Sequence, residues 1–82
     1  MVFVYLIRSL KPKVKWVYVG SANNVEKRLK QHNSGQVTST KSRRPYKLIH
    51  TEKYNTIDEA CAREKEIKRS RLIKENILRN IK

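Results

Sequence analysis

Residues 17–35 read VYVGSANNVEKRLKQHNSG and join an apolar run to a polar segment with helical spacing. The apolar run stops at Gly20, and the polar residues SANN follow it. Asn23 and Glu26 have the spacing of a capping box, in which each side chain binds a free amide at a helix start. We therefore expect a strand to end at Gly20 and a helix to begin directly after the polar break.

The predicted helix covers residues 24–33 and ends before Gly35, because glycine often terminates helices in the left-handed conformation. Arg28 and His32 are four residues apart, so they share one face with the two apolar residues of the helix. They could be solvated flanks of an amphipathic helix. If the face borders a cleft, the arginine could bind a phosphate and the histidine could exchange a proton near neutral pH.

The rest of the chain contains further segments with regular spacing. Dense β-branched and aromatic residues predict strands, and apolar residues spaced three and four apart predict helices. A second capping box, formed by Thr56 and Glu59, opens the first of these helices. The expected strands are 2–9, 14–19 and 46–54, and the expected helices are 57–69 and 71–81. The order is β-β-α-β-α-α, which indicates an α/β protein of the α+β type, with helices covering a small, mostly antiparallel sheet.

Length and charge restrict the function. The 82 residues suffice for one domain, 1–82, with one modest core. Lys and Arg number 20 against 7 Asp and Glu, a net charge of +13 that attracts nucleic acid. The apolar run 2–7 ends at Arg8, far short of the roughly 20 residues of a membrane span. A single cysteine, Cys61, allows no internal disulfide, so we expect a cytoplasmic protein that does not enter membranes.

Glu64 is the most informative residue of the predicted helix 57–69. It lies at the centre of a stripe whose other members are apolar: Ile57, Ala60, Cys61 and Ile67. An unpaired carboxylate there would be costly. The stripe predicts either an ion pair with a Lys or Arg, or a hard divalent cation such as Mg²⁺, which often takes only one or two protein carboxylates.

The aromatic residues of the first two strands also allow two interpretations. Tyr5, Trp16 and Tyr18 fit ordinary cross-strand packing. Two tyrosine hydroxyls beside an arginine and a carboxylate would instead form a small polar pocket on an apolar floor.

The predicted loop 36–45 and the start of the strand after it are basic. Cations interleaved with Ser and Thr can bind phosphate oxygens, although a merely solvated loop would have the same composition. The candidate nucleic-acid-binding residues are Lys41, Arg43, Arg44 and Lys47.

Together these short motifs resemble the GIY-YIG nuclease family, in particular its small stand-alone bacterial members. They occur in the family's order over residues 2–69: FVY with Tyr5, YVG with Tyr18 and Gly20, EKRLKQH with Arg28 and His32, and EACAREKEIK with Glu64. The sequence departs from the family pattern at Phe3, which replaces the first glycine, and at Val4 and Val19, which replace isoleucines. Asn76 and Asn80 are both candidates for the family's late asparagine.

The resemblance implies a three-stranded antiparallel sheet flanked by helices, and a metal-dependent endonuclease that hydrolyses DNA phosphodiesters, with a role in DNA repair or recombination. It implies a single Mg²⁺ or Mn²⁺ held by Glu64. Arg28 would neutralise the scissile phosphate, and His32 would assist nearby. Tyr5 and Tyr18 would orient or deprotonate the attacking water; with an ordinary pKa near 10, a tyrosine needs the metal or a proton relay to act as a base.

Two other functions explain the same composition. A basic module on the nuclease fold could bind DNA or RNA without cleaving it. A small ribosome-associated protein would have the same charge, but it would not explain the position of Glu64.

Overall fold

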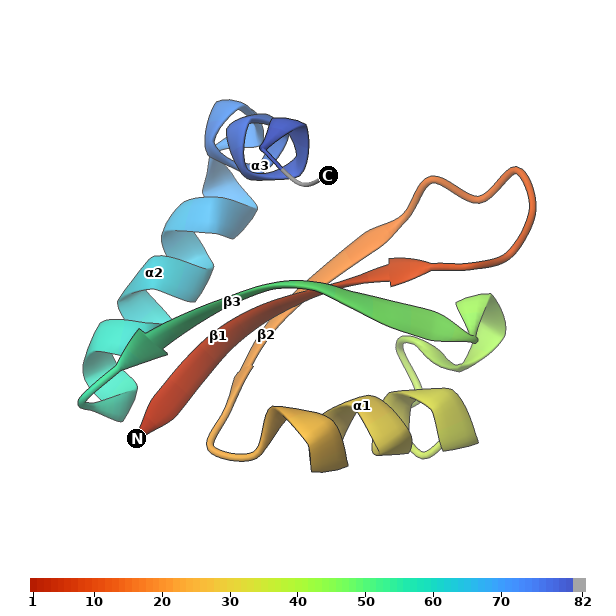
Figure 1. The fold of residues 1–82 in the computed structure, drawn as a ribbon, viewed down its shortest axis with the longest axis horizontal. Helices are drawn as coiled ribbons and strands as arrows, with labels where there is room; N and C mark the ends of the chain where they lie inside the picture. The colour runs from red at the N-terminus through yellow and green to blue at the C-terminus, as the bar shows by residue number, and fades with distance from the viewer. Residues whose placement is uncertain (81–82) are drawn as a thin grey trace.

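The computed structural model describes residues 1–80, which form a three-stranded sheet and three α-helices (Figure 1). The order is β-β-α-β-α-α, so the predicted α+β fold is confirmed. The elements are β1 (Val2–Ser9), β2 (Val17–Ala22), α1 (Val25–Ser34), a short 3₁₀ helix η1 (Lys41–Arg43), β3 (Tyr46–Tyr54), α2 (Ile57–Arg69) and α3 (Arg71–Arg79).

Strand β1 is the centre of the sheet, whose order is β2-β1-β3 with both pairings antiparallel. Val4, Tyr5, Leu6 and Ile7 are at most 1% exposed, which explains why this strand is apolar at successive positions. Strand β2 is an edge of the sheet.

The two faces of the sheet carry different helices. Val4 and Leu6 pack with Ala60 and Ile67 of α2, and partly buried residues of α3 join this cluster. On the other face, Tyr5 and Ile7 pack with Tyr46 and with the apolar residues of α1. Neighbouring residues of β1 therefore point to opposite layers, and Tyr5 points toward α1.

The second strand differs from its prediction at both ends. It begins at Val17 rather than residue 14, and it continues through Gly20 to Ala22. The polar residues after Gly20 remain in the sheet because β1 pairs with them, Val4 opposite Ser21 and Phe3 opposite Ala22. Gly20 therefore does not end the strand.

Because β2 continues to Ala22, the helix after it begins one residue later than predicted, at Val25. The cap of α1 is Asn24, not Asn23, and its side chain accepts a hydrogen bond from the Lys27 amide at 3.1 Å. Gly35 closes α1 as predicted, with φ 83°, although the helix extends to Ser34 rather than residue 33. In α2 the predicted cap is confirmed: the Thr56 hydroxyl accepts from the Glu59 amide at 3.2 Å. Helix α3 is described to Arg79, and the predicted residue 81 lies outside the described residues.

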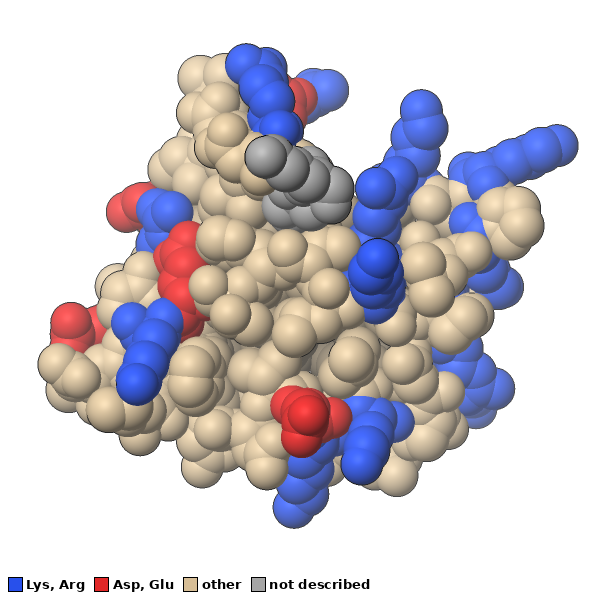
Figure 2. Space-filling model, in the orientation of Figure 1, with Lys and Arg blue, Asp and Glu red and all other residues tan. Residues whose placement is uncertain are grey.

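Charge is unevenly distributed over the molecule. Figure 2 shows one face, where Lys and Arg crowd the side that carries η1 and the connection between β1 and β2, while Asp and Glu lie over the opposite and lower parts. Within residues 1–80, every helix is too short or too polar to cross a bilayer.

Candidate active site

Tyr5 and His32 form the buried centre of the candidate site. Tyr5 comes from the middle of β1 and is 1% exposed, and His32 comes from the last turn of α1 and is fully buried. The Tyr5 hydroxyl lies 2.9 Å from His32 Nε2, and His32 Nδ1 lies 2.8 Å from the Thr40 hydroxyl. Three segments of the chain thus meet in one line of hydrogen bonds.

The network assigns the proton of the imidazole. The Thr40 hydroxyl donates to the Val37 carbonyl at 3.3 Å, so its oxygen is left to accept from His32 Nδ1–H. Nε2 then has no proton, and it accepts from the Tyr5 O–H. This assignment follows from the hydrogen-bond pattern and makes His32 a neutral acceptor for the Tyr5 proton.

Burial keeps both groups uncharged. Burial and the neighbouring Tyr18 raise the pKa of Tyr5 to about 12, an effect that Arg28 opposes through a hydrogen bond and its charge and that Glu64 increases. Burial, and then the positive charge of Arg28, lower the pKa of His32. Tyr5 therefore keeps its proton at neutral pH, and His32 has its lone pair available.

Tyr18 lies beside this pair, from the neighbouring strand β2, and is half-buried. Its ring centroid is 4.9 Å from that of His32 and 6.2 Å from that of Tyr5. Gly20 stands opposite Tyr5 in the strand pairing, and a Cβ there would lie 2.7 Å from the Tyr5 hydroxyl and 2.8 Å from the Tyr18 ring. Gly20 is therefore required for the close approach of the two tyrosines.

Arg28 and Glu64 reach the site from the two helix layers. Arg28 is half-buried, and its Nη1 donates to the Gln31 side chain at 2.8 Å. Both charges act on the Tyr5 hydroxyl, Arg28 lowering its pKa and Glu64 raising it. The Glu64 side chain is 20% exposed.

Glu64 is held by an ion pair, as one of the two sequence interpretations expected. Lys68 Nζ donates to its Oε2 at 2.8 Å, one helical turn away. The same ammonium lies 5.9 Å from the centroid of the Tyr18 ring. The carboxylate at the centre of the α2 stripe is therefore next to the tyrosine cluster, and a cation already faces it.

The donor set fits a metal that needs few protein ligands. Within residues 1–80, no three His, Cys, Asp or Glu side chains gather closely enough to form a metal cage. Glu64 is a partly exposed carboxylate beside an exposed edge of the tyrosine cluster. Mg²⁺ and Mn²⁺ suit such a site because water and substrate phosphate can supply their other ligands.

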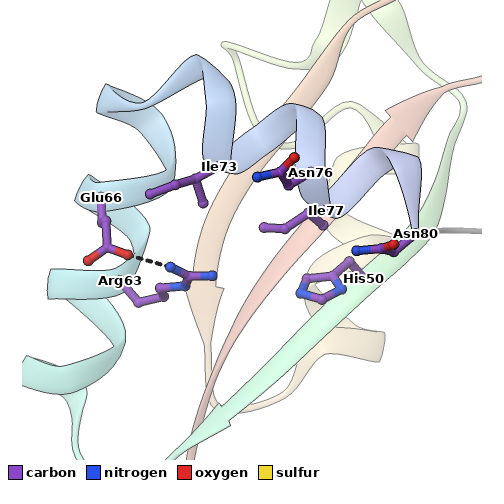
Figure 3. Close-up of a pocket in the computed structure, with 7 residues that line it drawn as sticks. All are labelled: His50, Arg63, Glu66, Ile73, Asn76, Ile77 and Asn80. Carbon is purple, nitrogen blue, oxygen red and sulfur yellow. Dashed lines mark hydrogen bonds and ion pairs between the residues drawn. The ribbon is translucent and has the colours of Figure 1, made fainter.

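The two late asparagines lie elsewhere. Asn76 and Asn80 line a pocket of about 610 Å³ between β3, α2 and α3, together with His50, Arg63 and Glu66 (Figure 3). None of the five predicted site residues lines this pocket.

A satisfied ion-pair network forms one wall of that pocket. Burial raises the pKa of Glu52, but hydrogen bonds from Arg63, His50 and Tyr54 outweigh it and hold the pKa at about 2. The polar groups of this wall therefore have a structural explanation.

The basic candidates lie on η1 and the residues that follow it. Lys41, Arg43, Arg44 and Lys47 are all exposed. The Arg43 guanidinium lies 4.6 Å from the centroid of the Trp16 ring, and Trp16 is 6.1 Å from Tyr18, ring to ring. A line of aromatic rings thus connects this loop to the site.

Thr40 and Lys68 belong to the site but were not predicted. Thr40 stands in a polar loop, and only the packing of that loop against α1 buries it completely. Lys68 had one sequence signal, its spacing of four residues from Glu64, which is also common on solvated helix surfaces.

The tyrosine, arginine and carboxylate arrangement can be compared with known proteins. The family described as the GIY-YIG catalytic domain matches residues 1–76. The chain belongs to the GIY-YIG family. Its membership agrees with the observed sheet order and with the position of Tyr5 and Tyr18 on neighbouring strands.

Several UPF0213 proteins are similar to this chain over most of their length. A UPF0213 protein from Syntrophus aciditrophicus is 40% identical over 82 residues, which cover 90% of this chain and 91% of the relative. A UPF0213 protein from Staphylococcus saprophyticus is 42% identical over 67 residues, 80% and 78% of the two chains. The solution NMR structure of a UPF0213 protein from Bacillus halodurans aligns with a TM-score of 0.57 at 32% identity, covering 95% of this chain and 83% of that one.

Proposed function

We propose that this GIY-YIG protein is a DNA endonuclease that hydrolyses phosphodiester bonds with Mg²⁺ or Mn²⁺. The observation that carries the proposal is the meeting of Tyr18, Arg28 and Glu64 around the buried pair of Tyr5 and His32. Cleavage during DNA repair or recombination is the proposed setting, supported by the family resemblance alone.

Arg28 is the proposed phosphate-binding group. A guanidinium is always charged and presents a planar fork that matches two phosphate oxygens. In the free protein it bonds Gln31 and acts on the Tyr5 hydroxyl, so a bound phosphate would draw it away from both. Arg28 would then offset the negative charge that develops on the phosphate during attack.

The tyrosines and His32 are proposed to manage the proton of the attacking water. Tyr18 has exposed surface and would meet the water first, whereas Tyr5 is 1% exposed and lies behind it, hydrogen-bonded to His32. As the water oxygen bonds to phosphorus, the water proton passes to the Tyr5 oxygen and the Tyr5 proton passes to His32 Nε2. The bond from phosphorus to the leaving sugar oxygen breaks, and that oxygen takes a proton from solvent. The pair thus avoids a free tyrosinate, which a pKa of about 12 makes scarce at neutral pH.

Glu64 is the proposed metal ligand. A divalent cation bound there would acidify water and stabilise charge on the phosphate oxygens. Lys68 Nζ bonds Oε2 of this carboxylate in the free protein, so a metal held by that oxygen would displace the ammonium.

Replacing one carboxylate tests the proposal. Glu64→Gln should reduce Mg²⁺- or Mn²⁺-dependent nicking of supercoiled DNA by on the order of 100-fold or more, because it removes the ligand but keeps the side-chain shape. Glu75→Gln is the matched control, since Glu75 pairs with Arg71 on α3 and should leave nicking unchanged. Circular dichroism checks that both variants fold. Wild-type cleavage by Glu64→Gln would contradict the proposal.

A second function is favoured by two features of the free protein. Tyr5 is covered, and Lys68 occupies the proposed metal ligand, which are both expected of a module that binds nucleic acid without cleaving it. Binding without turnover on duplex, branched and single-stranded DNA, with either metal present, would support this alternative.

A further inference from the structure

Two segments distant in sequence are joined beside the site. Residues 8–16 comprise the last two residues of β1 and the connection to β2, and residues 41–47 include η1 and the start of β3. Backbone carbonyls of the second segment accept three hydrogen bonds from the first: Ser9 Oγ to Arg43 O at 2.6 Å, Lys11 Nζ to Ser42 O at 2.7 Å and Leu10 N to Pro45 O at 2.8 Å. The two segments therefore form one continuous surface, which we call the basic end.

The basic end concentrates positive charge. Its two segments contain no Asp or Glu, and all of their cations are exposed: Arg8, Lys11, Lys13, Lys15, Lys41, Arg43, Arg44 and Lys47. This is the side of the molecule where Figure 2 shows Lys and Arg crowded together. Such a field attracts polyanions and holds them without base recognition.

No cation of the basic end has a carboxylate within ion-pair distance among residues 1–80. The ion pairs formed within residues 1–80 involve Arg63, Lys68 and Arg71 of α2 and α3, together with His50, and none includes a cation of the basic end. Phosphates can therefore bind the basic end without first breaking an ion pair between described residues.

The basic end also leads toward the tyrosines. The Arg43 guanidinium rests on the Trp16 ring, a contact that restricts its motion and lowers the entropy lost on binding a phosphate. Trp16 neighbours Tyr18, and Tyr18 neighbours His32. The basic end therefore adjoins the candidate active site, and a nucleic-acid strand bound on it would lead to the tyrosines.

We infer that residues 8–16 and 41–47 together bind the phosphate backbone of one DNA molecule and hold it against the site. The inference deepens the proposed nuclease function and rests on it for the identity of the polymer. It adds the connection 8–16, with Lys13 and Lys15, to the loop cations that the sequence indicated. Recognition is through phosphate, so it is independent of base sequence.

The salt dependence of binding tests the inference, measured without metal in the Glu64→Gln background so that no cleavage occurs. Lys13→Gln with Lys15→Gln is compared with Lys53→Gln with Lys65→Gln, an exposed pair of equal charge away from the basic end. Each lost phosphate contact should reduce the slope of log K against log salt by roughly 0.9. The first pair should therefore lower the slope by about 1.8, and the control should leave it nearly unchanged.

A third pair, Lys41→Gln with Lys47→Gln, tests whether both segments bind the same DNA. When the two pairs of substitutions are combined, their changes in the salt slope should add, and one protein should still bind one DNA molecule. Equal slopes for the Lys13 and Lys15 pair and its control would overturn the inference, as would binding to an RNA hairpin at least tenfold tighter than to the matching DNA hairpin.

Binding and cleavage are read separately, so the two proposals can fail separately. If the salt slopes change as expected but the wild-type chain cleaves no DNA, the nuclease function is refuted and DNA binding by the basic end is supported. If the wild-type chain cleaves DNA but the salt slopes of the variants are unaltered, the nuclease function is supported and DNA binding by the basic end is refuted.

Discussion

His32 of α1 joins strand β1 to the loop after α1, because each of its ring nitrogens has a hydrogen-bond partner, Tyr5 on one side and Thr40 on the other. Sequence spacing placed it with Arg28 on one helix face, where a solvated flank and a cleft were both consistent with the pattern. Its complete burial, with a partner on each ring nitrogen, decides between them. The spacing could not reveal this because Tyr5 and Thr40, its partners, lie 27 and 8 residues away in sequence.

The buried imidazole predicts a pH dependence of stability. Burial and Arg28 lower the folded-state pKa of His32 below its ordinary value of 6.5, so below that value the unfolded chain binds more protons than the folded one. This stability is present above pH 6.5 and is lost as the pH falls. Urea unfolding between pH 7 and 5 should show a falling free energy of unfolding that His32→Gln no longer shows.

The pH range of this loss distinguishes His32 from the partly buried ion-pair network around Glu52. Glu52 has a folded-state pKa of about 2 against an ordinary 4.5, so its contribution is lost only between those values. His50→Gln, which changes the other histidine of the chain, should retain the loss between pH 7 and 5. An unchanged pH profile in His32→Gln would contradict the assignment.

At the scale of elements, β2 shows where sequence reasoning succeeded and where it failed. The sequence predicts the strand, but not its bounds: it begins later than its apolar run, and the polar residues after Gly20, whose composition indicates a break, remain in the strand. Pairing with β1 satisfies their backbone, a tertiary effect that local composition does not record. The capped helix α2 was predicted at both ends because its signals are local.

The pairing of Gly20 with Tyr5 predicts the effect of adding one methyl group. Gly20→Ala should lower the free energy of unfolding by about 1–3 kcal/mol, because its Cβ would overlap the Tyr5 hydroxyl and the Tyr18 ring. Urea denaturation measures the change. Adding Tyr5→Phe should recover part of the loss, since it removes the oxygen that the new methyl group meets.

The neighbouring residue provides the comparison for this element. Ser21 is half-buried in the same strand, and Ser21→Ala removes atoms rather than adding them. Its effect should be clearly smaller than that of Gly20→Ala. Equal losses in the two variants would mean that the close approach of the tyrosines is not what Gly20 provides.

At the scale of the whole molecule, the net charge of +13 affects both the stability of the fold and the attraction of polyanions. Composition predicted attraction to nucleic acid, and spacing predicted the fold class, because both depend on sums or on local periodicity. The gathering of residues 8–16 with 41–47, and of Glu64 with the tyrosines, could not be predicted in this way. Those contacts depend on how the β1–β2 connection and α2 pack against the rest of the chain.

The same charge predicts opposite salt effects on stability and on binding. Salt screens the mutual repulsion of the 20 Lys and Arg, so the Tm should rise between 10 and 200 mM NaCl. A gain of 1 kcal/mol would raise it by about 4–8 °C in a domain of this size. DNA affinity should fall over the same range. Differential scanning calorimetry and binding titrations measure the two, and a Tm that falls with salt would contradict the expectation.

The chain has one tryptophan, Trp16, which lies under Arg43 at the part of the basic end that adjoins Tyr18. Its ultraviolet emission therefore originates at a single known place in the molecule. A polyanion that binds this guanidinium alters the charge and polarity beside the indole on which it rests, and therefore the emission of the fluorophore. The protein thus contains its own optical reporter, with which substrate arrival can be timed in a stopped-flow instrument without attaching a dye.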